Sequence, residues 1–320
     1  MLAMTSFESF KTVHGKTYSE DEHDKRFGIF QANLEKIAAK NAALAEAGED
    51  QVHGITRFAD LTEDEFQFFL GVDANIKAPK MEIFSGETVN ATSGSYNLAD
   101  DNLLTAVKDQ EQCGSCWAFS ATETIETAWI KAGNKMTEFS PQQIVSCDSK
   151  DAGCNGGLPT QAFDYVKGAG GMASSSAYPY TSGTGTTGTC DSAKESATVG
   201  GTVSSWAYAQ DACQGFSACK EDTDAIAGVL KAHGGISIAI DASEWSSYTG
   251  GVMTSTSCSS SPRKMDHAVQ LVGYNADADV PYWIVRNSWN TSWGNDGFIY
   301  LKMGDNTCGI ANLAAYIDSI

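Results

Sequence analysis

The sequence predicts an α+β protein in which a helical N-terminal region precedes a larger region with a helical half and a β half. Helical spacing of apolar and polar positions dominates the first seventy residues. All nine cysteines lie at or beyond position 113, so a second region with different chemistry begins before that point. Beyond about residue 235, β-branched and aromatic runs bounded by turns replace the helical pattern. A length of 320 residues allows two or three domains.

The first region is expected to contain one long helix. Ser19 and Glu22 have the spacing of a capping box that opens it, and Gly48 is expected to end it. Six side chains recur at three- and four-residue steps along this helix and are therefore expected to share one face. They are Glu22, Arg26, Phe30, Asn33, Ile37 and Asn41.

A shorter helix is expected after an extended stretch at residues 53–62. Thr62 and Glu65 form a second capping box, and the helix is predicted to continue to Leu70. Residues 71–94 show no apolar period and are predicted to be an exposed linker. Such linkers are where proteases cut.

The larger region is predicted to begin with helices and end with strands. Helical patterns cover 116–132, 140–146 and 158–168. The expected strands are the runs ISIAI (236–240), HAVQLVGY (267–274), PYWIVRNSW (281–289) and GFIYLKM (297–303).

Charge excludes two classes of partner. The net charge is −19, and both regions contribute: residues 1–94 carry 9 Lys and Arg against 16 Asp and Glu, and residues 95–320 carry 12 against 24. Such a surface repels phosphate backbones and anionic lipids, so neither nucleic acid nor membrane is expected as a partner. The N-terminal stretch has no basic segment followed by an apolar one, so it is not expected to act as a secretory signal.

Nine cysteines predict four bonded pairs and one free thiol, which is typical of a protein from an oxidising compartment. A zinc cluster is the main alternative. It is disfavoured because the larger region has only two histidines and no repeated Cys-x-x-Cys spacing, so no metal is expected.

The pair Cys113 and Cys116 can be a redox pair, half of a zinc site, or a bonded cysteine beside a free nucleophile. Cys116 lies where a helix is expected to begin, and a helix N-terminus favours thiolate over thiol. A redox pair is disfavoured because a loop precedes this helix rather than a strand of a βαβ unit. His233 is expected to end a helix as a structural residue, whereas His267 begins a strand and is the favoured base.

Five motifs, in this order, resemble the papain family of cysteine peptidases over residues 96–320. They are Gln110, CGSCWAF (113–119), GCNGG (153–157), DHAVQLVGY (266–274) and NSWNTSWG (287–294). The first ninety residues resemble the inhibitory pro-region of this family, through the helix face described above and through GITRFAD (54–60).

The resemblance implies a papain-like two-domain fold, with a helical half and a β-barrel-like half, preceded by an α-helical pro-domain. It divides the chain into an inhibitory pro-domain (1–70), a linker and activation region (71–94) and a peptidase domain (95–320). The whole resembles cathepsin L-like proenzymes.

The resemblance also assigns roles. Cys116 is expected to be the nucleophile, held with His267 as a thiolate–imidazolium pair. Asn287 is expected to orient the imidazole, and Trp289 to cover that contact. The side-chain amide of Gln110 and the backbone N–H of Cys116 are expected to form the oxyanion hole.

Gly156 and Gly157 are expected to let a substrate strand approach the backbone. The resemblance implies an apolar specificity pocket, and hence a preference for a bulky apolar residue before the scissile one; no cofactor is implied. The expected substrate-binding residues are Gly156, Gly157, Leu158, Pro159, Met265, Asp266, Ala268, Trp289 and Leu313.

Three disulfides follow from the resemblance: Cys113–Cys154, Cys147–Cys190 and Cys258–Cys308. Cys213 and Cys219 are expected to bond to each other within an insertion at roughly 205–222.

Three positions depart from the family pattern. Glu111 replaces a usual glycine beside the oxyanion hole, and Thr56 replaces the asparagine of the short pro-region element. Asn290 replaces another glycine and creates a glycosylation sequence, as Asn90 does in the linker.

The expected function is therefore that of a monomeric cysteine endopeptidase zymogen, lysosomal, vacuolar or secreted, activated in acid. Its partners would be polypeptide substrates and its own pro-region. Two alternatives stay open: a non-catalytic binding or inhibitor protein of the same family, and a thiol acyltransferase using the same residues.

Overall fold

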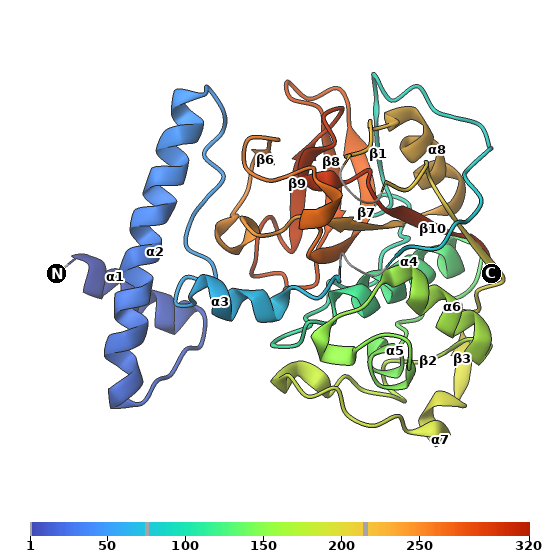
Figure 1. The fold of residues 1–320 in the computed structure, drawn as a ribbon, viewed down its shortest axis with the longest axis horizontal. Helices are drawn as coiled ribbons and strands as arrows, with labels where there is room; N and C mark the ends of the chain where they lie inside the picture. The colour runs from blue at the N-terminus through green and yellow to red at the C-terminus, as the bar shows by residue number, and fades with distance from the viewer. Residues whose placement is uncertain (1, 74–76, 214–216) are drawn as a thin grey trace.

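The computed structural model describes residues 2–73, 77–213 and 217–320. The N-terminal helices stand to one side of a larger body that has helices at one end and a sheet at the other (Figure 1). The helices of the first region are α1 (Leu2–Val13), α2 (Glu20–Glu46) and α3 (Glu63–Phe66). Helices α1 and α2 meet at a small aromatic core that contains Phe7, Phe10 and Phe30.

Helix α2 begins and ends close to the predicted positions, but the capping box predicted at its start is wrong. Ser19 is the N-cap residue, yet its side chain makes no capping hydrogen bond. The Glu22 carboxylate instead accepts a hydrogen bond from Arg26 Nε at 3.0 Å along the helix face. Gly48 has a left-handed φ of 74°, a conformation that favours glycine and suits the end of a helix.

The second predicted capping box is confirmed. Thr62 accepts from the Glu65 backbone N–H at 3.2 Å, and Glu65 accepts from the Thr62 N–H at 2.9 Å. Helix α3 is shorter than expected, because a 3₁₀ turn at Gln67–Phe69 replaces its second half.

Helices α4 (Cys116–Lys131), α5 (Pro141–Cys147) and α6 (Pro159–Ala169) confirm the three predicted helices of the larger region. Helix α4 is buried along most of its length and lies against the sheet, where Ser120 Oγ donates to the Val269 carbonyl at 2.8 Å. A short helix, α7 (Ser192–Glu195), and the paired strands β2 (Met172–Ala173) and β3 (Thr198–Gly200) complete this half.

The β half is one sheet in the order β4-β10-β5-β7-β8-β9-β6, with β1 also paired to β7. Strands β5, β7, β8 and β9 confirm the four predicted strands. The strands are β1 (Ser95–Asn97), β4 (Ser205–Tyr208), β5 (Ile236–Ile240), β6 (Val252–Met253), β7 (His267–Asn275), β8 (Tyr282–Arg286), β9 (Phe298–Lys302) and β10 (Ala314–Ser319).

The segment interpreted as an insertion at 205–222 is partly a core element. Its first residues form β4, which pairs with β10 at the edge of the sheet. Residues 214–216 lie outside the described residues. Helix α8 (Thr223–His233) follows and ends at His233, as expected.

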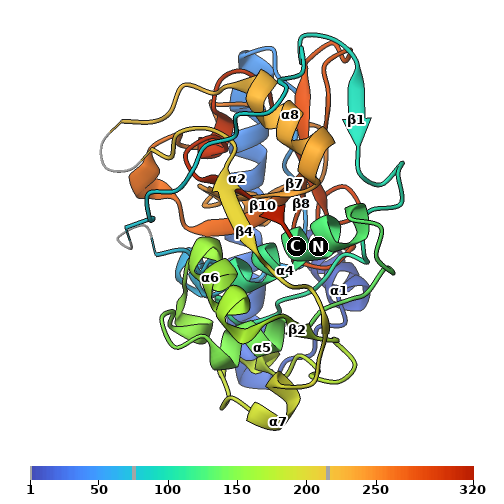
Figure 2. The ribbon, with the colours of Figure 1, turned by 90° about the vertical axis from the view of Figure 1, so that its right-hand side faces the viewer.

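The prediction that residues 71–94 form an exposed linker is only partly right. Gly71 and Val72 pair with the peptidase region at Gly157, and Ile83 pairs with Tyr208. Ala78 and Ala91 are buried. Figure 2 shows the linker passing β4 and α8 on its way to β1; residues 74–76 lie outside the described residues.

Four disulfides join the pairs that the resemblance and the remaining cysteines implied: Cys113–Cys154, Cys147–Cys190, Cys213–Cys219 and Cys258–Cys308. Cys116 is a free, buried thiol.

Candidate active site

Cys116 is the first residue of α4, so its sulfur lies at the positive end of a helix of 16 residues. The side chain is fully buried. Cys113 is bonded to Cys154 and cannot pair with Cys116. The two cysteines of the Cys-x-x-Cys sequence therefore have different chemistry, one structural and one available as a nucleophile.

His267 is the first residue of β7, and its imidazole is held from two sides. Its Nε2 lies 2.8 Å from Asn287 Oδ1, just beyond the end of the neighbouring strand β8. The Trp289 ring stacks on the imidazole with centroids 4.6 Å apart and planes 30° apart. Because Asn287 occupies Nε2, the other ring nitrogen, Nδ1, stays available for a proton; among the described residues it has no hydrogen-bond partner.

The start of α4 and the start of β7 come together at the sulfur. The backbone N–H groups of Ala268, next to His267, and of Gly71 act as hydrogen-bond donors that favour the charged form of Cys116. Burial outweighs them and raises the pKa of the Cys116 thiol to about 12, while burial lowers the pKa of His267 to about 4. Both shifts favour the neutral forms while the site is covered, and the thiolate–imidazolium pair stays a prediction for the open enzyme.

The side chain of Gln110, predicted to serve the oxyanion hole, is fully buried and hydrogen-bonded. Its Nε2 donates to the Phe69 carbonyl at 2.9 Å and to the Cys113 carbonyl at 2.8 Å. Ser288 Oγ donates to Gln110 Oε1 at 2.7 Å, which fixes the orientation of the amide. The donor that an oxyanion would use is thus engaged by a carbonyl of the N-terminal region.

Residues 70–72 follow the 3₁₀ turn and cross the site, with an isolated bridge between Val72 and Gly157. The Gly157 N–H donates to the Gly71 carbonyl at 2.9 Å, and the Val72 N–H donates to the Asp266 carbonyl at 2.9 Å. A Cβ added to Gly71 would lie 2.0 Å from the Gly114 carbonyl oxygen, so no side chain fits there. Gly156, with a φ of 114°, lies against the same segment.

Four of the predicted substrate-binding residues, Leu158, Met265, Ala268 and Leu313, share one buried apolar cluster with Cys116, whereas Trp289 belongs to the other large cluster. Ala78 of the linker belongs to this cluster, and Val72 packs against it. Leu158, Met265, Ala268 and Leu313 are each less than 10% exposed, and Pro159 is buried at the start of α6.

The N-terminal region also contacts the Trp289 side of the site. The rings of Phe58 and Phe66 meet Trp289 edge-on, with centroids 5.2 and 5.4 Å away. Arg57 donates to Asp109 Oδ2 at 2.6 Å, and Asp109 is the residue directly before Gln110.

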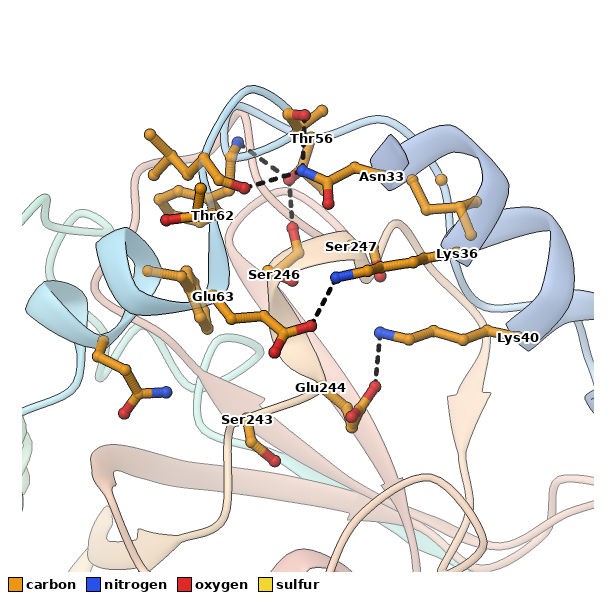
Figure 3. A pocket seen from close by; sticks show the side chains of 17 residues that line it. Asn33, Lys36, Lys40, Thr56, Thr62, Glu63, Ser243, Glu244, Ser246 and Ser247 are labelled. Atoms are coloured by element: carbon orange, nitrogen blue, oxygen red, sulfur yellow. Dashed lines mark hydrogen bonds and ion pairs between the residues drawn. The ribbon is translucent and has the colours of Figure 1, made fainter. Parts of the chain in front are cut away.

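A pocket of about 190 Å³ lies between α2 and the loop at residues 243–247 (Figure 3). Lys40 reaches across it to Glu244 with a 2.5 Å ion pair, whereas Lys36 pairs with Glu63 within the N-terminal region at 2.6 Å. Thr56 donates to the Ser246 carbonyl and is 2% exposed, so it joins the two regions although it departs from the family pattern.

The face predicted on α2 holds the N-terminal region together. Arg26 donates to Glu65 Oε2 at 2.7 Å and to the Asp60 carbonyl at 3.0 Å. Asn33 donates to two carbonyls of residues 59–61, and Asn41 bonds both backbone groups of His53.

Sequence reasoning missed Ser288, Phe69 and Gly71 as functional residues. Ser288 is part of the quoted NSWNTSWG motif, and Gly71 directly follows the predicted helix end, so both signals were present. Glu111 has a left-handed φ of 51°, which explains why glycine is favoured there. Its carboxylate lies against Gly183.

The fold and this site together define a cysteine protease whose active site is covered by its own N-terminal region. Residues 93–317 match the family described as papain family cysteine protease, and residues 7–66 match the cathepsin propeptide inhibitor domain. The chain belongs to the papain family of cysteine proteases, and it is a proenzyme with an intramolecular inhibitory pro-region.

Similar proteins agree with this assignment. The chain is 35% identical to cysteine proteinase 1 of Dictyostelium discoideum, over 97% of this chain and 91% of that protein. It is 37% identical to thiol protease aleurain of Arabidopsis thaliana, over 97% and 83%. Its structure is similar to digestive procathepsin L 3 of Tenebrio molitor larval midgut, with a TM-score of 0.80, 32% identity and 99% of each chain covered.

Proposed function

We propose that this chain is the zymogen of an endopeptidase that cleaves peptide bonds through Cys116 and His267, with Asn287 and Gln110 in supporting roles. The observation that carries the proposal is the position of the free Cys116 thiol, at the start of α4, against the backbone of Ala268, the residue directly after the Asn287-bound His267. The proposed domains are the pro-domain 1–70, the activation linker 71–94 and the peptidase domain 95–320.

Once the cleft is open, the Cys116 thiolate attacks the peptide carbonyl carbon. The oxyanion accepts hydrogen bonds from Gln110 Nε2 and from the Cys116 backbone N–H. The His267 imidazolium gives its proton to the leaving amine as the C–N bond breaks, which leaves a thioester. Water then loses a proton to His267, attacks the thioester and releases the acid, and the proton remains on His267 to restore the ion pair.

The pro-region inhibits by lying in the cleft in a non-productive direction. Val72 pairs with Gly157 in parallel, whereas a productive substrate is proposed to run antiparallel to the same residue. The Phe69 carbonyl on Gln110 therefore belongs to a chain that Cys116 cannot attack in the correct geometry.

Acid is proposed to release the pro-domain. Burial opposes ionisation of Glu65, but hydrogen bonds from Arg26 and from the Thr62 backbone lower its pKa below the ordinary value. A carboxylate with a lowered pKa stabilises the folded pro-domain above its free pKa, and this stabilisation is lost as pH falls through the lowered value. The proposed activation therefore occurs on the acid side of the ordinary Glu pKa.

The apolar cluster of Leu158, Met265, Ala268 and Leu313 supports a preference for a bulky apolar residue before the scissile one. Substrate contacts are also proposed for Asp266, whose carbonyl already binds Val72. We place the protein in a lysosome, a vacuole or outside the cell, as a monomer. Among the described residues no helix combines the length and apolar character needed to cross a bilayer.

Titration with an epoxide inhibitor of papain-like enzymes, followed by a peptide panel in acid, tests the proposal. One equivalent of inhibitor bound, with peptide cleavage that Cys116→Ala abolishes, supports it. Binding without hydrolysis supports an acyltransferase instead. No binding after the pro-region has been removed supports a non-catalytic member of the family.

A further inference from the structure

Residues 79–91, here called the outer segment, make a second set of contacts with the peptidase region after the chain has left the cleft. The Phe84 N–H donates to the Tyr208 carbonyl at 2.8 Å, and the Tyr208 N–H donates to the Glu82 carbonyl at 3.0 Å. Tyr208 belongs to β4, which lies at the edge of the main sheet. The outer segment thus adds a short parallel strand to an otherwise open edge.

A side chain anchors this added strand. The Phe84 ring lies edge-on to His233 and to Tyr316, with centroids 5.9 and 6.1 Å away, and those two rings are 4.6 Å from each other. Gly228, on α8, supplies the space: a Cβ there would lie 3.1 Å from the Phe84 ring and 2.8 Å from the Glu87 carbonyl oxygen. Gly228, His233 and Tyr316 are called the aromatic notch below.

The start of α8 holds the end of the outer segment. The Val89 N–H donates to the Asp224 carbonyl at 3.2 Å, and the Ala91 N–H donates to the Asp224 carboxylate at 2.8 Å. Ile83, between the two strand hydrogen bonds, is 43% exposed. A groove of about 740 Å³ runs beside the outer segment, between residues 80–86 and residues 205–207 with His233 and Tyr316.

The contacts of the outer segment consist of backbone hydrogen bonds and the packing of one aromatic ring. None of them involves the proposed catalytic residues. Backbone hydrogen bonds at a sheet edge accept almost any extended sequence, while a pocket for one side chain selects among them. When the pro-region is cut away, the β4 edge and the aromatic notch lose their occupant.

We propose that the β4 edge and the aromatic notch form a second peptide-binding site of the mature protease, outside the active site. It takes an extended segment of a polypeptide substrate that adds a parallel strand to β4 and places a phenylalanine ring in the notch. The outer segment occupies this site in the proenzyme. The inference rests on the proposed removal of the pro-region, and it adds a docking site to the proposed peptidase.

The test uses mature enzyme, prepared by acid activation and blocked at Cys116 with the epoxide, and a fluorescent peptide with the sequence of residues 79–91, PKMEIFSGETVNA. We expect saturable binding by fluorescence anisotropy. A peptide with Phe84→Ala should bind about tenfold or more weakly, because it loses a partly buried ring. The matched control peptide, with Ile83→Ala, loses a side chain that is exposed in the proenzyme. Its affinity should stay within about twofold of the parent peptide.

A pair of helical glycines provides the enzyme-side control. Gly228→Ala places a methyl group against the Phe84 ring and the Glu87 carbonyl, so it should weaken peptide binding by about tenfold. Gly168→Ala, on α6, meets nothing within 4 Å and should leave binding unchanged. Both variants should cleave a short fluorogenic peptide as the parent does, because neither residue touches the cleft.

The mass of the activated chain is measured first. If residues 79–91 remain attached, the groove stays covered and the inference is overturned. Absence of saturable peptide binding, or equal binding by Gly228→Ala, also overturns it. The proposed function fails separately. If the peptide bound but no peptidase activity were found, the docking site would be supported and the proposed endopeptidase function would be wrong.

Discussion

The pro-region and the peptidase region are stabilised by different interactions. The helical pro-region has a core of four buried residues, Phe7, Phe10, Phe30 and Ala59, and has no cysteine. Polar and ionic contacts supply much of the rest, among them the Arg26 bonds to Glu22 and Glu65. The peptidase region has four disulfides and most of two large buried clusters, the first of which also includes pro-region side chains such as Phe58, Phe66 and Phe69.

This difference shows how one chain can contain both a durable enzyme and a releasable inhibitor. Ionic contacts depend on pH, whereas disulfides and buried apolar side chains do not titrate in acid. The pro-region is therefore the part that acid weakens first. It also reaches the active site, where the Gly71 backbone contacts Cys116 and the Phe69 carbonyl accepts a hydrogen bond from Gln110.

The largest expected effect is on the reactivity of Cys116. In the proenzyme, burial raises the pKa of the thiol to about 12 and lowers that of His267 to about 4. Removing the pro-region should reverse both shifts and increase the rate of iodoacetamide alkylation at acid pH by about 10³ or more. Alkylation rates measured across pH on proenzyme and mature enzyme check this.

Alkylation of Cys116→Ala in the same assay gives the background from other groups. If mature enzyme and proenzyme reacted at equal rates in acid, the pro-region would block the cleft without altering the thiol, and the proposed link between burial and ionisation would be wrong.

The second prediction compares two buried phenylalanines. Phe30 lies in the small pro-region core and Phe139 in a large peptidase cluster, and both are 0% exposed. Either alanine variant should lose about 3–5 kcal/mol of unfolding free energy in its own region. Phe30→Ala should therefore unfold the pro-region and give a proenzyme that is active without acid, whereas Phe139→Ala should stay folded with a lower melting temperature.

Calorimetry with limited proteolysis separates the two cases. A single shared transition, lowered equally by both variants, would show that the two regions unfold as one unit and that the comparison fails.

The local elements were predictable from the sequence because their signals are local. The apolar spacing at 116–132 and 158–168 predicted α4 and α6, and the β-branched runs predicted β5 and β7 to β9. The polar face of α2 was found because its residues are separated by single helical turns. Roles were assigned to Gln110, Cys116, His267 and Asn287 because these residues lie in or just before short motifs, and the roles stay predictions.

The missed features depend on contacts between distant segments. Strands β4 and β10 pair with each other across more than a hundred residues, and nothing near either one signals that partner. The attachment of residues 79–91 requires β4 and the glycine on α8. The contacts of the Gly71 backbone with Cys116 and of the Phe69 carbonyl with Gln110 likewise join segments far apart in the sequence, so only the folded chain reveals them.

The third prediction concerns the disulfides. Cys113–Cys154 closes a loop with a sequence separation of 41, and Cys213–Cys219 one with a separation of 6. Replacing both cysteines of a pair by alanine should cost about 4 kcal/mol for the first and about 2 kcal/mol for the second, because longer loops lose more chain entropy when closed. Denaturant unfolding of the two double variants measures the difference; equal losses would contradict the loop-length argument.

The smallest expected effect concerns His53, which lies between the two regions. It is 7% exposed, its Nδ1 is 2.9 Å from Ser247 Oγ, and its charged neighbours are Lys40 of the pro-region and Glu244 of the peptidase. Burial lowers its pKa from 6.5 to about 4. The neutral form is thus favoured in the complex, so docking is strongest above pH 6.5, weakens as pH falls from 6.5 to about 4, and loses no more from this group below that.

Glutamine in place of His53 keeps a hydrogen-bonding group near Ser247 but does not titrate. His53→Gln should therefore need more acid to activate, by about one pH unit or less, because carboxylates still contribute. His23→Gln, in the pro-region away from the peptidase contact, is the control and should activate like the parent. Identical activation profiles for all three proteins, measured by peptide cleavage after timed acid exposure, would assign the acid response to the carboxylates alone.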